Sequence, residues 1–172
     1  MGISAGGSGG EIRETKDKRD IDLDDERFAM KGYEHQTQYY ETDQMGIIHH
    51  SNYIRWFESA RIWYMKEIGV DYADMERQGI ISPVLEVHCV YKSMVHFGDV
   101  VEILPKVEKY NGVTLELSYS VLDQVSGELR TTGSSRHCFL NREGRPLSLK
   151  KESPLFDEAF RKALAVDRSL PE

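Results

Sequence analysis

The sequence predicts an α+β fold, in which one long amphipathic helix lies beside an antiparallel sheet of about five strands. The first observation is the segment SNYIRWFESARIWYMKEIG at 51–69, where apolar side chains recur at helical spacing. The second is a change of character after residue 80, where β-branched and aromatic residues alternate with polar ones. The sequence also lacks internal repeats, so we expect one domain rather than a repeat array.

Before the long helix, we expect a tail, a strand and a loop. Residues 1–30 combine a Gly/Ser-rich start with a charged stretch that offers little to bury, which is typical of a flexible tail. Residues 32–40 alternate like a half-exposed strand, and the segment ETDQMGIIHHSN breaks this alternation. The domain is therefore expected to span residues 31–165, with residues 166–172 as a C-terminal tail.

Capping signals delimit two helices. Ser51 or Asn52 is the expected N-cap of the long helix, and Gly69 is the residue expected to stop it. A shorter helix is predicted over residues 72–78, with Asp71 as its N-cap. The aromatic stripe of the long helix is expected to face the core rather than a cofactor.

Four strands and a last helix are expected in the C-terminal half. The segments SPVLEVHCVYKSMV, DVVEILPKVEKY, VTLELSYSVLDQ and ELRTTGSSRHCFLN carry the alternation, and turn signals separate them. Asn111-Gly112 is a good hairpin signal between two of them. Ser153-Pro154 then starts a terminal helix, with proline at its first position.

Composition argues against several classes of function. The 29 acidic and 22 basic residues give a net charge of -7, whereas contacts with nucleic-acid phosphates need a basic face. The six histidines show no ligand spacing such as H-E-x-x-H, so no metal is expected. No apolar run approaches the roughly 20 residues of a membrane-spanning helix. Cys89 and Cys138 resemble small buried residues of a reducing compartment, and we expect a cytoplasmic protein.

The loop that enters the long helix carries the candidate chemistry. Asp43 lies seven residues before His50, close to the expected helix start. Free N–H groups at a helix start can stabilise an oxyanion, and a carboxylate nearby can attack a carbonyl or activate water. Gly46 lets a substrate approach the backbone. The spacing is equally compatible with an Asx-turn role for Asp43 and a simple turn role for Gly46.

The segment YYETDQMGIIHHSNYIRWFE resembles the signature of the 4-hydroxybenzoyl-CoA thioesterase family of hotdog proteins, close to the bacterial group associated with the Tol-Pal cluster. In this signature an aromatic residue precedes an acidic stretch that ends in the catalytic aspartate. A two-residue His-His stands here where an aromatic-histidine pair is more usual. A weaker likeness covers residues 32–160. The matching positions are Tyr40, Asp43, Gly46, Ile47, Ile48, His49, His50, Tyr53, Phe57 and Glu58.

The resemblance implies a hotdog fold, with the sheet wrapped around the long helix, and assigns roles to individual residues. Asp43 would be the nucleophile or the general base, and the backbone N–H of His50 would polarise the thioester carbonyl. The His50 side chain is a candidate for orienting water or substrate, with a helix-start hydrogen bond as the alternative. Gly46, Ile48 and Tyr53 would line the substrate site, although Tyr53 needs no such role if it packs in the core.

Three further charged residues are weaker candidates. In other hotdog branches a helix glutamate carries the catalysis, but we expect Glu58 to form a helix-surface ion pair with Arg55 or Arg61. Lys92 and Arg136 are candidates for contacts with the phosphates of coenzyme A. Both residues are equally compatible with solvated positions on strands.

Three functions follow from these observations. The leading one is an acyl-CoA thioesterase that needs no metal or redox cofactor and releases coenzyme A as a product. The resemblance implies a homodimer or homotetramer, with sites near subunit interfaces. The alternative is a non-catalytic acyl-CoA or acyl-carrier binding protein, against which Asp43 counts. A hotdog dehydratase is disfavoured, because the sequence lacks the His-Phe-Pro context of that chemistry.

Overall fold

The structure is a computed structural model that describes residues 32–169. The expected tail over residues 1–30 lies outside the described residues, as do residues 170–172. In chain order the elements are β1 (Tyr33–Gln36), the 3-10 helix η1 (Tyr39–Glu41), α2 (Ser51–Glu67), α3 (Tyr72–Arg77), β2 (Val84–Tyr91), β3 (Val100–Tyr110), β4 (Thr114–Asp123), β5 (Leu129–Cys138), α4 (Leu149–Glu152) and α5 (Pro154–Ser169).

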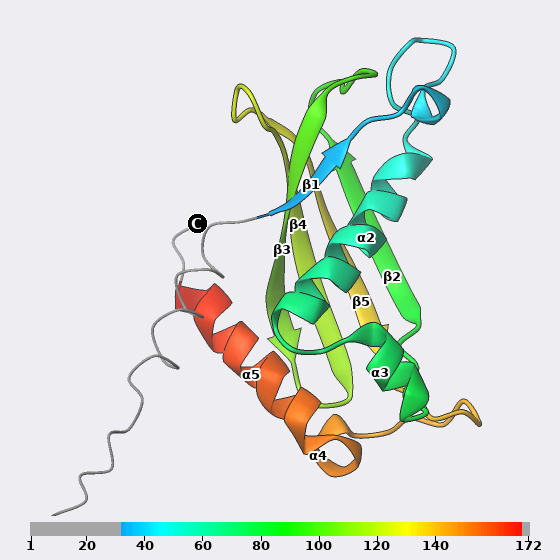
Figure 1. Ribbon diagram of the computed structural model, residues 1–172, viewed down its shortest axis with the longest axis vertical. Coiled ribbons are helices and arrows are strands. Elements are labelled where there is room, and N and C mark those ends of the chain that lie inside the picture. The colour runs from blue at the N-terminus through cyan, green and yellow to red at the C-terminus, as the bar shows by residue number, and fades with distance from the viewer. Residues whose placement is uncertain (1–31, 170–172) are drawn as a thin grey trace, which may run out of the picture.

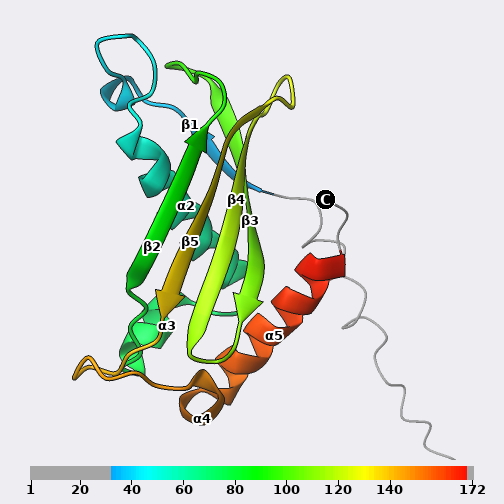
Figure 2. The same ribbon diagram turned by 180° about the vertical axis from the view of Figure 1, so that it is seen from behind.

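The five strands form one antiparallel sheet in the order β1-β3-β4-β5-β2. Helix α2 lies along one face of this sheet, with α3 at its C-terminal end (Figure 1). From behind, the opposite face of the sheet is seen with no helix in front of it (Figure 2). One long helix beside a five-stranded antiparallel sheet confirms the predicted α+β class.

The core lies between α2 and the sheet, as the aromatic stripe predicts. Phe57 of α2 stacks on Tyr119 of β4, with ring centroids 4.5 Å apart. Gly133 of β5 lies directly beneath the Phe57 ring, which leaves no space there for a side chain. The apolar side chains of α2 that are at most 4% exposed are Tyr53, Trp56, Phe57, Ala60, Tyr64 and Met65.

Strand β1 is shorter than predicted. It ends at Gln36, because Thr37 bonds to the loop before β3 instead of continuing a strand ladder. The Thr37 N–H donates to the carbonyl of Asp99 at 3.0 Å, and its hydroxyl donates to the carbonyl of His96 at 2.7 Å. The chain then turns into η1, so the predicted strand over residues 37–40 is wrong.

The boundaries of α2 and α3 follow their signals, with one exception. His50 is the N-cap of α2, in a helical backbone conformation, so the predicted capping by Ser51 or Asn52 is wrong. Gly69 closes this helix with φ +84°, as predicted for a left-handed stop residue. Asp71 caps α3, since its carboxylate accepts a backbone N–H two residues further on at 2.8 Å.

Helix α5 lies beside β3 (Figure 1). Two buried carboxylates, Asp157 and Asp167, attach it. Asp157 accepts a hydrogen bond from Tyr110 at 2.8 Å, and Asp167 accepts one from Tyr64 at 2.6 Å. Asp167 also accepts from the backbone N–H of Val107 at 2.6 Å. These bonds hold α5 against the part of β3 that has no pairing with β1.

The C-terminal segment differs from the prediction in two details. The one-turn helix α4 was not predicted. Helix α5 starts at Pro154, as predicted, but it continues to Ser169, past the residue 165 that was expected to end the domain.

Candidate active site

The loop between η1 and α2 lies at the N-terminal end of α2 (Figure 1). Backbone hydrogen bonds close a turn within it. The N–H of Asp43 donates to the carbonyl of Ile47 at 2.9 Å, and the N–H of Gly46 donates to the carbonyl of Asp43 at 3.0 Å. Thr42 and Ile48 form a β-bridge at the base of the turn. Gly46 has φ +74°, a conformation that L side chains rarely adopt, so glycine is required here for the turn itself.

The Asp43 side chain is half-buried within this turn. Its Oδ1 accepts a hydrogen bond from the N–H of Met45 at 2.8 Å, which is the Asx-turn arrangement. Within residues 32–169, its Oδ2 receives no hydrogen bond. One carboxylate oxygen therefore fixes the side chain, and the other is available to a substrate or a water molecule.

The three backbone amides that lead into α2 differ in their hydrogen bonds. The N–H of His49 donates to the carbonyl of Glu41 at 2.8 Å. The N–H of Ser51 faces Nδ1 of His49 at 3.3 Å. Between them, the N–H of His50 donates to no acceptor in the described part of the chain. A free amide at the start of a 17-residue helix combines a hydrogen-bond donor with the positive end of the helix dipole.

The His50 side chain is exposed, and its ring packs on that of His49 with centroids 4.0 Å apart. The hydrogen bonds at the helix start belong to His49, whose Nδ1 contacts Ser51 Oγ at 2.8 Å. The helix-start hydrogen bond expected as the alternative role of the His50 ring is therefore wrong.

Ile48 and Tyr53 lie in the core beneath the helix start. Both are 3% exposed, and the Tyr53 ring packs against Trp56 and Tyr91 at 4.6 and 5.1 Å. Burial raises the pKa of Tyr53 to about 12, so its phenol stays neutral at physiological pH. Tyr91 in turn donates from its hydroxyl to the carbonyl of His50 at 3.0 Å. The packed-core role of Tyr53 is confirmed, and its contact with a substrate stays a prediction.

Sequence reasoning missed Glu41, which is 5% exposed. Its carboxylate accepts hydrogen bonds from the Gln38 N–H at 2.7 Å, Trp56 Nε1 at 2.8 Å and His35 Nε2 at 3.0 Å. Burial raises the pKa of this carboxyl, but the hydrogen bonds from these three donors outweigh burial and hold the pKa below its ordinary value. The signal in the sequence was the indole N–H of a core-facing tryptophan, which needs an acceptor.

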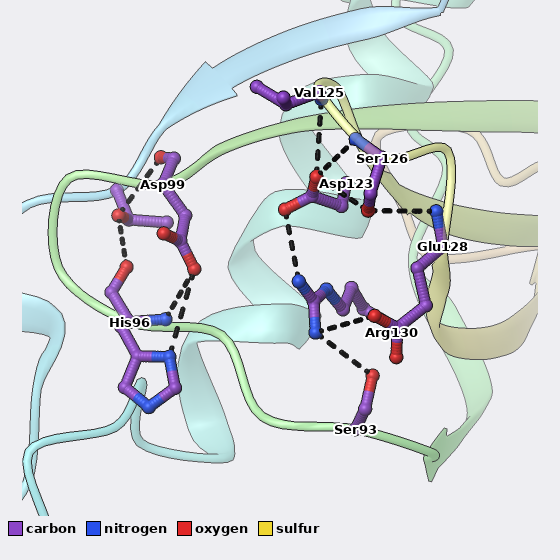
Figure 3. Close-up of polar contacts among 9 residues, drawn as sticks. Ser93, His96, Asp99, Asp123, Val125, Ser126, Glu128 and Arg130 are labelled. Carbon is purple, nitrogen blue, oxygen red and sulfur yellow. Dashed lines mark hydrogen bonds and ion pairs between the residues drawn. The ribbon is translucent and has the colours of Figure 1, made fainter.

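The loop between β2 and β3 supports the turn from the other side. The N–H of Ile48 donates to the carbonyl of Val95 at 2.8 Å. Figure 3 shows how this loop is held: Asp99 accepts from the His96 N–H at 2.8 Å, while Arg130 contacts Ser93 at 3.4 Å. Arg130 is itself anchored by Asp123 and Glu128, both at 3.1 Å.

The weaker candidates lie elsewhere. Glu58 is exposed and has no ion pair with any described residue, so its predicted pairing with Arg55 or Arg61 is wrong. Arg61 instead turns inward, is 4% exposed and lies over the Tyr72 ring at 5.7 Å.

Arg136 pairs with Glu86 at 2.9 Å in a hollow of about 260 Å³ on the sheet face opposite α2, which Asp43 does not line. Lys92 is exposed just after β2. A contact of either cation with a phosphate stays a prediction.

Within residues 32–169, no group of three or more His, Cys, Asp or Glu side chains could hold a metal ion. No helix in the same part of the chain is long and apolar enough to cross a membrane.

This arrangement, an antiparallel sheet around one long helix, is the hotdog fold, and the chain belongs to the thioesterase-like superfamily, which residues 37–164 match. A crystal structure described as DHNA-CoA thioesterase from Staphylococcus aureus is similar, with a TM-score of 0.76 and 37% identity over 80% of this chain and 93% of that chain. The Bacillus subtilis (strain 168) protein YneP, provisionally named an acyl-CoA thioesterase, is 35% identical over 74% of this chain and 93% of its own length.

The structure of BH1999, a gentisyl-coenzyme A thioesterase, shares the fold at 21% identity and a TM-score of 0.66, over 72% of this chain and 99% of that chain. The predicted hotdog fold and thioesterase class are thereby confirmed. Membership of the narrower 4-hydroxybenzoyl-CoA or Tol-Pal-associated group stays a prediction. The same holds for the roles of Asp43, His50, Gly46, Ile48 and Tyr53.

Proposed function

We propose that this protein hydrolyses acyl-CoA thioesters to a free acid and coenzyme A, with Asp43 as the catalytic carboxylate. The observation that carries the proposal is that, within residues 32–169, the N–H of His50 at the start of α2 has no acceptor and Asp43 in the adjacent turn keeps one oxygen free. Thioester cleavage needs both a donor for the developing oxyanion and a base or nucleophile, and this loop supplies one of each.

The chemistry then follows from the two groups. The thioester carbonyl oxygen accepts a hydrogen bond from the His50 N–H, which makes the carbonyl carbon more electrophilic. The free oxygen of Asp43 either attacks that carbon, forming an anhydride that water later hydrolyses, or takes a proton from an attacking water. In both routes the C–S bond breaks, the coenzyme A thiolate leaves and is protonated, and the acid is released.

The relatives support this substrate class. YneP carries an acyl-CoA thioesterase name, and the similar Staphylococcus aureus structure is described as DHNA-CoA thioesterase. Both are at least 35% identical to this chain and are covered over 93% of their length. We propose an acyl-CoA ester as the substrate. Esters with an aromatic acyl group should be among the first compounds tested.

We further propose a homodimer or homotetramer with sites near the subunit interface. Strand β2 is an outer strand of the sheet, so one of its edges has no partner strand within the described chain. Its apolar residues are unusually exposed: Val84 and Leu85 at 50%, Val90 at 56% and Tyr91 at 47%. Tyr91 contacts the start of α2, so a second copy on this edge would lie beside the proposed site.

Release of free thiol from a panel of aliphatic and aromatic acyl-CoA esters tests the activity. We expect Asp43→Asn to keep the fold and lower turnover by about a hundredfold or more, since the amide is neither base nor nucleophile. Near-normal turnover in this variant would move the catalytic role elsewhere, with Glu58 as the next candidate.

The alternative function, a non-catalytic acyl-CoA or acyl-carrier binding protein, is favoured by the Asx-turn bond of Asp43, which gives this residue a purely structural role. A binding protein would retain acyl-CoA in equilibrium dialysis and release no thiol above background. Thiol release by the wild-type chain that Asp43→Asn abolishes would exclude it.

A further inference from the structure

Glu41 is a buried carboxylate that the proposed mechanism does not use. It lies two residues before Asp43, and its side chain is 6% exposed. Each carboxylate oxygen already accepts hydrogen bonds from the protein: Oε1 from Trp56, Oε2 from the Gln38 N–H, and both from His35. The carboxylate is therefore held by internal donors and is not presented to a substrate.

These donors come from separate elements of the fold. His35 belongs to β1, Gln38 precedes η1, and Trp56 lies one turn into α2. The ring of His35 also packs on that of Trp56, with centroids 4.9 Å apart. The carboxylate of Glu41 thus ties the strand before the catalytic turn to the helix after it.

The backbone carbonyl of Glu41 makes a second connection. It accepts from the His49 N–H and from Asn52 Nδ2, both at 2.8 Å. The bond to His49 closes the base of the turn that contains Asp43. It also engages the amide that directly precedes that of His50, whose N–H meets no acceptor within residues 32–169.

From these contacts we infer that Glu41 is the positioning residue of the active site, which sets the distance between the Asp43 carboxylate and the His50 N–H. The inference rests on the proposed function. Asp43 lies two residues after Glu41, and His50 one residue after the amide that Glu41 engages, so movement of Glu41 displaces both groups. A displacement of about 1 Å between reacting groups costs on the order of a hundredfold in rate.

The variant Glu41→Gln tests this inference. It keeps the shape of the side chain but replaces one acceptor oxygen with an NH2 group, which faces a donor whichever way the amide is turned. The matched control is Asp157→Asn. The Asp157 carboxylate is likewise buried, at 7% exposed, and it accepts hydrogen bonds from the Tyr110 hydroxyl and from Arg161. It belongs to α5, which lies away from the turn (Figure 1).

We expect both variants to lower Tm, but only Glu41→Gln to lower kcat for acyl-CoA hydrolysis, by about tenfold or more. KM should change much less, because Glu41 does not contact the substrate. The backbone amide resonance of His50 in a 1H–15N spectrum should shift in Glu41→Gln and stay in place in Asp157→Asn. A purely structural role would change Tm and leave kcat and this resonance unaltered.

A kcat within about twofold of wild type in folded Glu41→Gln would overturn the inference. If Glu41→Gln does not fold, Trp56→Phe removes the indole N–H that bonds the same carboxylate, together with part of the ring. This variant should lower kcat and shift the His50 resonance in the same direction, to a smaller extent. If the wild-type chain releases no thiol from any ester, the proposed function fails instead. The His50 resonance then still decides whether Glu41 positions the turn.

Discussion

The packing of α2 against the sheet can be tested at Gly133 of β5. This residue has no positive φ, so its substitution by alanine adds no backbone strain, only a methyl group. That Cβ would lie 2.3 Å from Cε2 and 2.4 Å from Cζ of Phe57, and 2.9 Å from the carbonyl oxygen of His88. Real contacts of this kind are not found below 3.0 Å, so Gly133→Ala must displace either the ring or the strand.

The ring of Phe57 has little freedom to move. It is 2% exposed and stacks on Tyr119 with an interplanar angle of 11°. Overpacking of a core costs about 1–3 kcal/mol, and contact with both a packed ring and a backbone oxygen places Gly133→Ala at the upper end of that range. For a chain of this size each kcal/mol lowers Tm by roughly 2–4 °C. We therefore expect Tm to fall by about 6–12 °C.

Urea unfolding followed by circular dichroism measures this loss, with Ser134→Ala on the opposite sheet face as a control that should stay within about 0.5 kcal/mol of wild type. Phe57→Leu removes the two ring atoms that Cβ would meet. In that background Gly133→Ala should cost at least about 1 kcal/mol less, which is a coupling that a double-mutant cycle detects. A Tm within about 1 °C of wild type for Gly133→Ala would refute the close packing of Phe57 of α2 against Gly133 of β5.

Further predictions concern the core, the C-terminal helix, the site and pH. Trp56→Ala should cost about 3–5 kcal/mol, and an unchanged melting temperature would show that its ring is not in the core. Tyr64→Phe removes a donor from the buried Asp167 and should cost about 1–3 kcal/mol in urea unfolding. His50→Ala keeps the backbone N–H and should lower kcat for thiol release far less than Asp43→Asn does; an equal loss would show that the His50 ring acts on the substrate. The pKa of Glu41 is below its ordinary value when folded, so its stabilisation is present above the ordinary glutamate pKa and is lost as pH falls through the folded value. The Tm difference between wild type and Glu41→Gln should therefore narrow on acidification from pH ~6 to ~3.

The sequence was informative where structure depends on local patterns. The apolar stripe of α2, the cap Asp71, the stop at Gly69 and the start of α5 at Pro154 were all confirmed. Each of these depends on residues close in the chain, whose spacing or backbone preference is visible without a fold. The aromatic face of α2 was confirmed for the same reason.

Features that depend on distant partners were missed. β1 ends early because Thr37 bonds a loop about 60 residues away, and no alternation of side chains reports that. Arg61 was expected on the helix surface, but it lies inward over Tyr72, and Glu58 has no ion-pair partner among residues 32–169. Glu41 was overlooked because its importance arises only when β1 and α2 converge on it.

The attachment of α5 covers a strand edge to which another chain could otherwise add. β1 pairs only with Val100–Ile103 of the longer β3, so the remainder of that strand would expose free backbone groups. Asp167 of α5 accepts a hydrogen bond from one of these groups, the N–H of Val107. Exposed strand edges recruit other chains. A protein shortened to lack α5 should therefore form concentration-dependent aggregates through this newly bared edge, even where its α2 core remains folded.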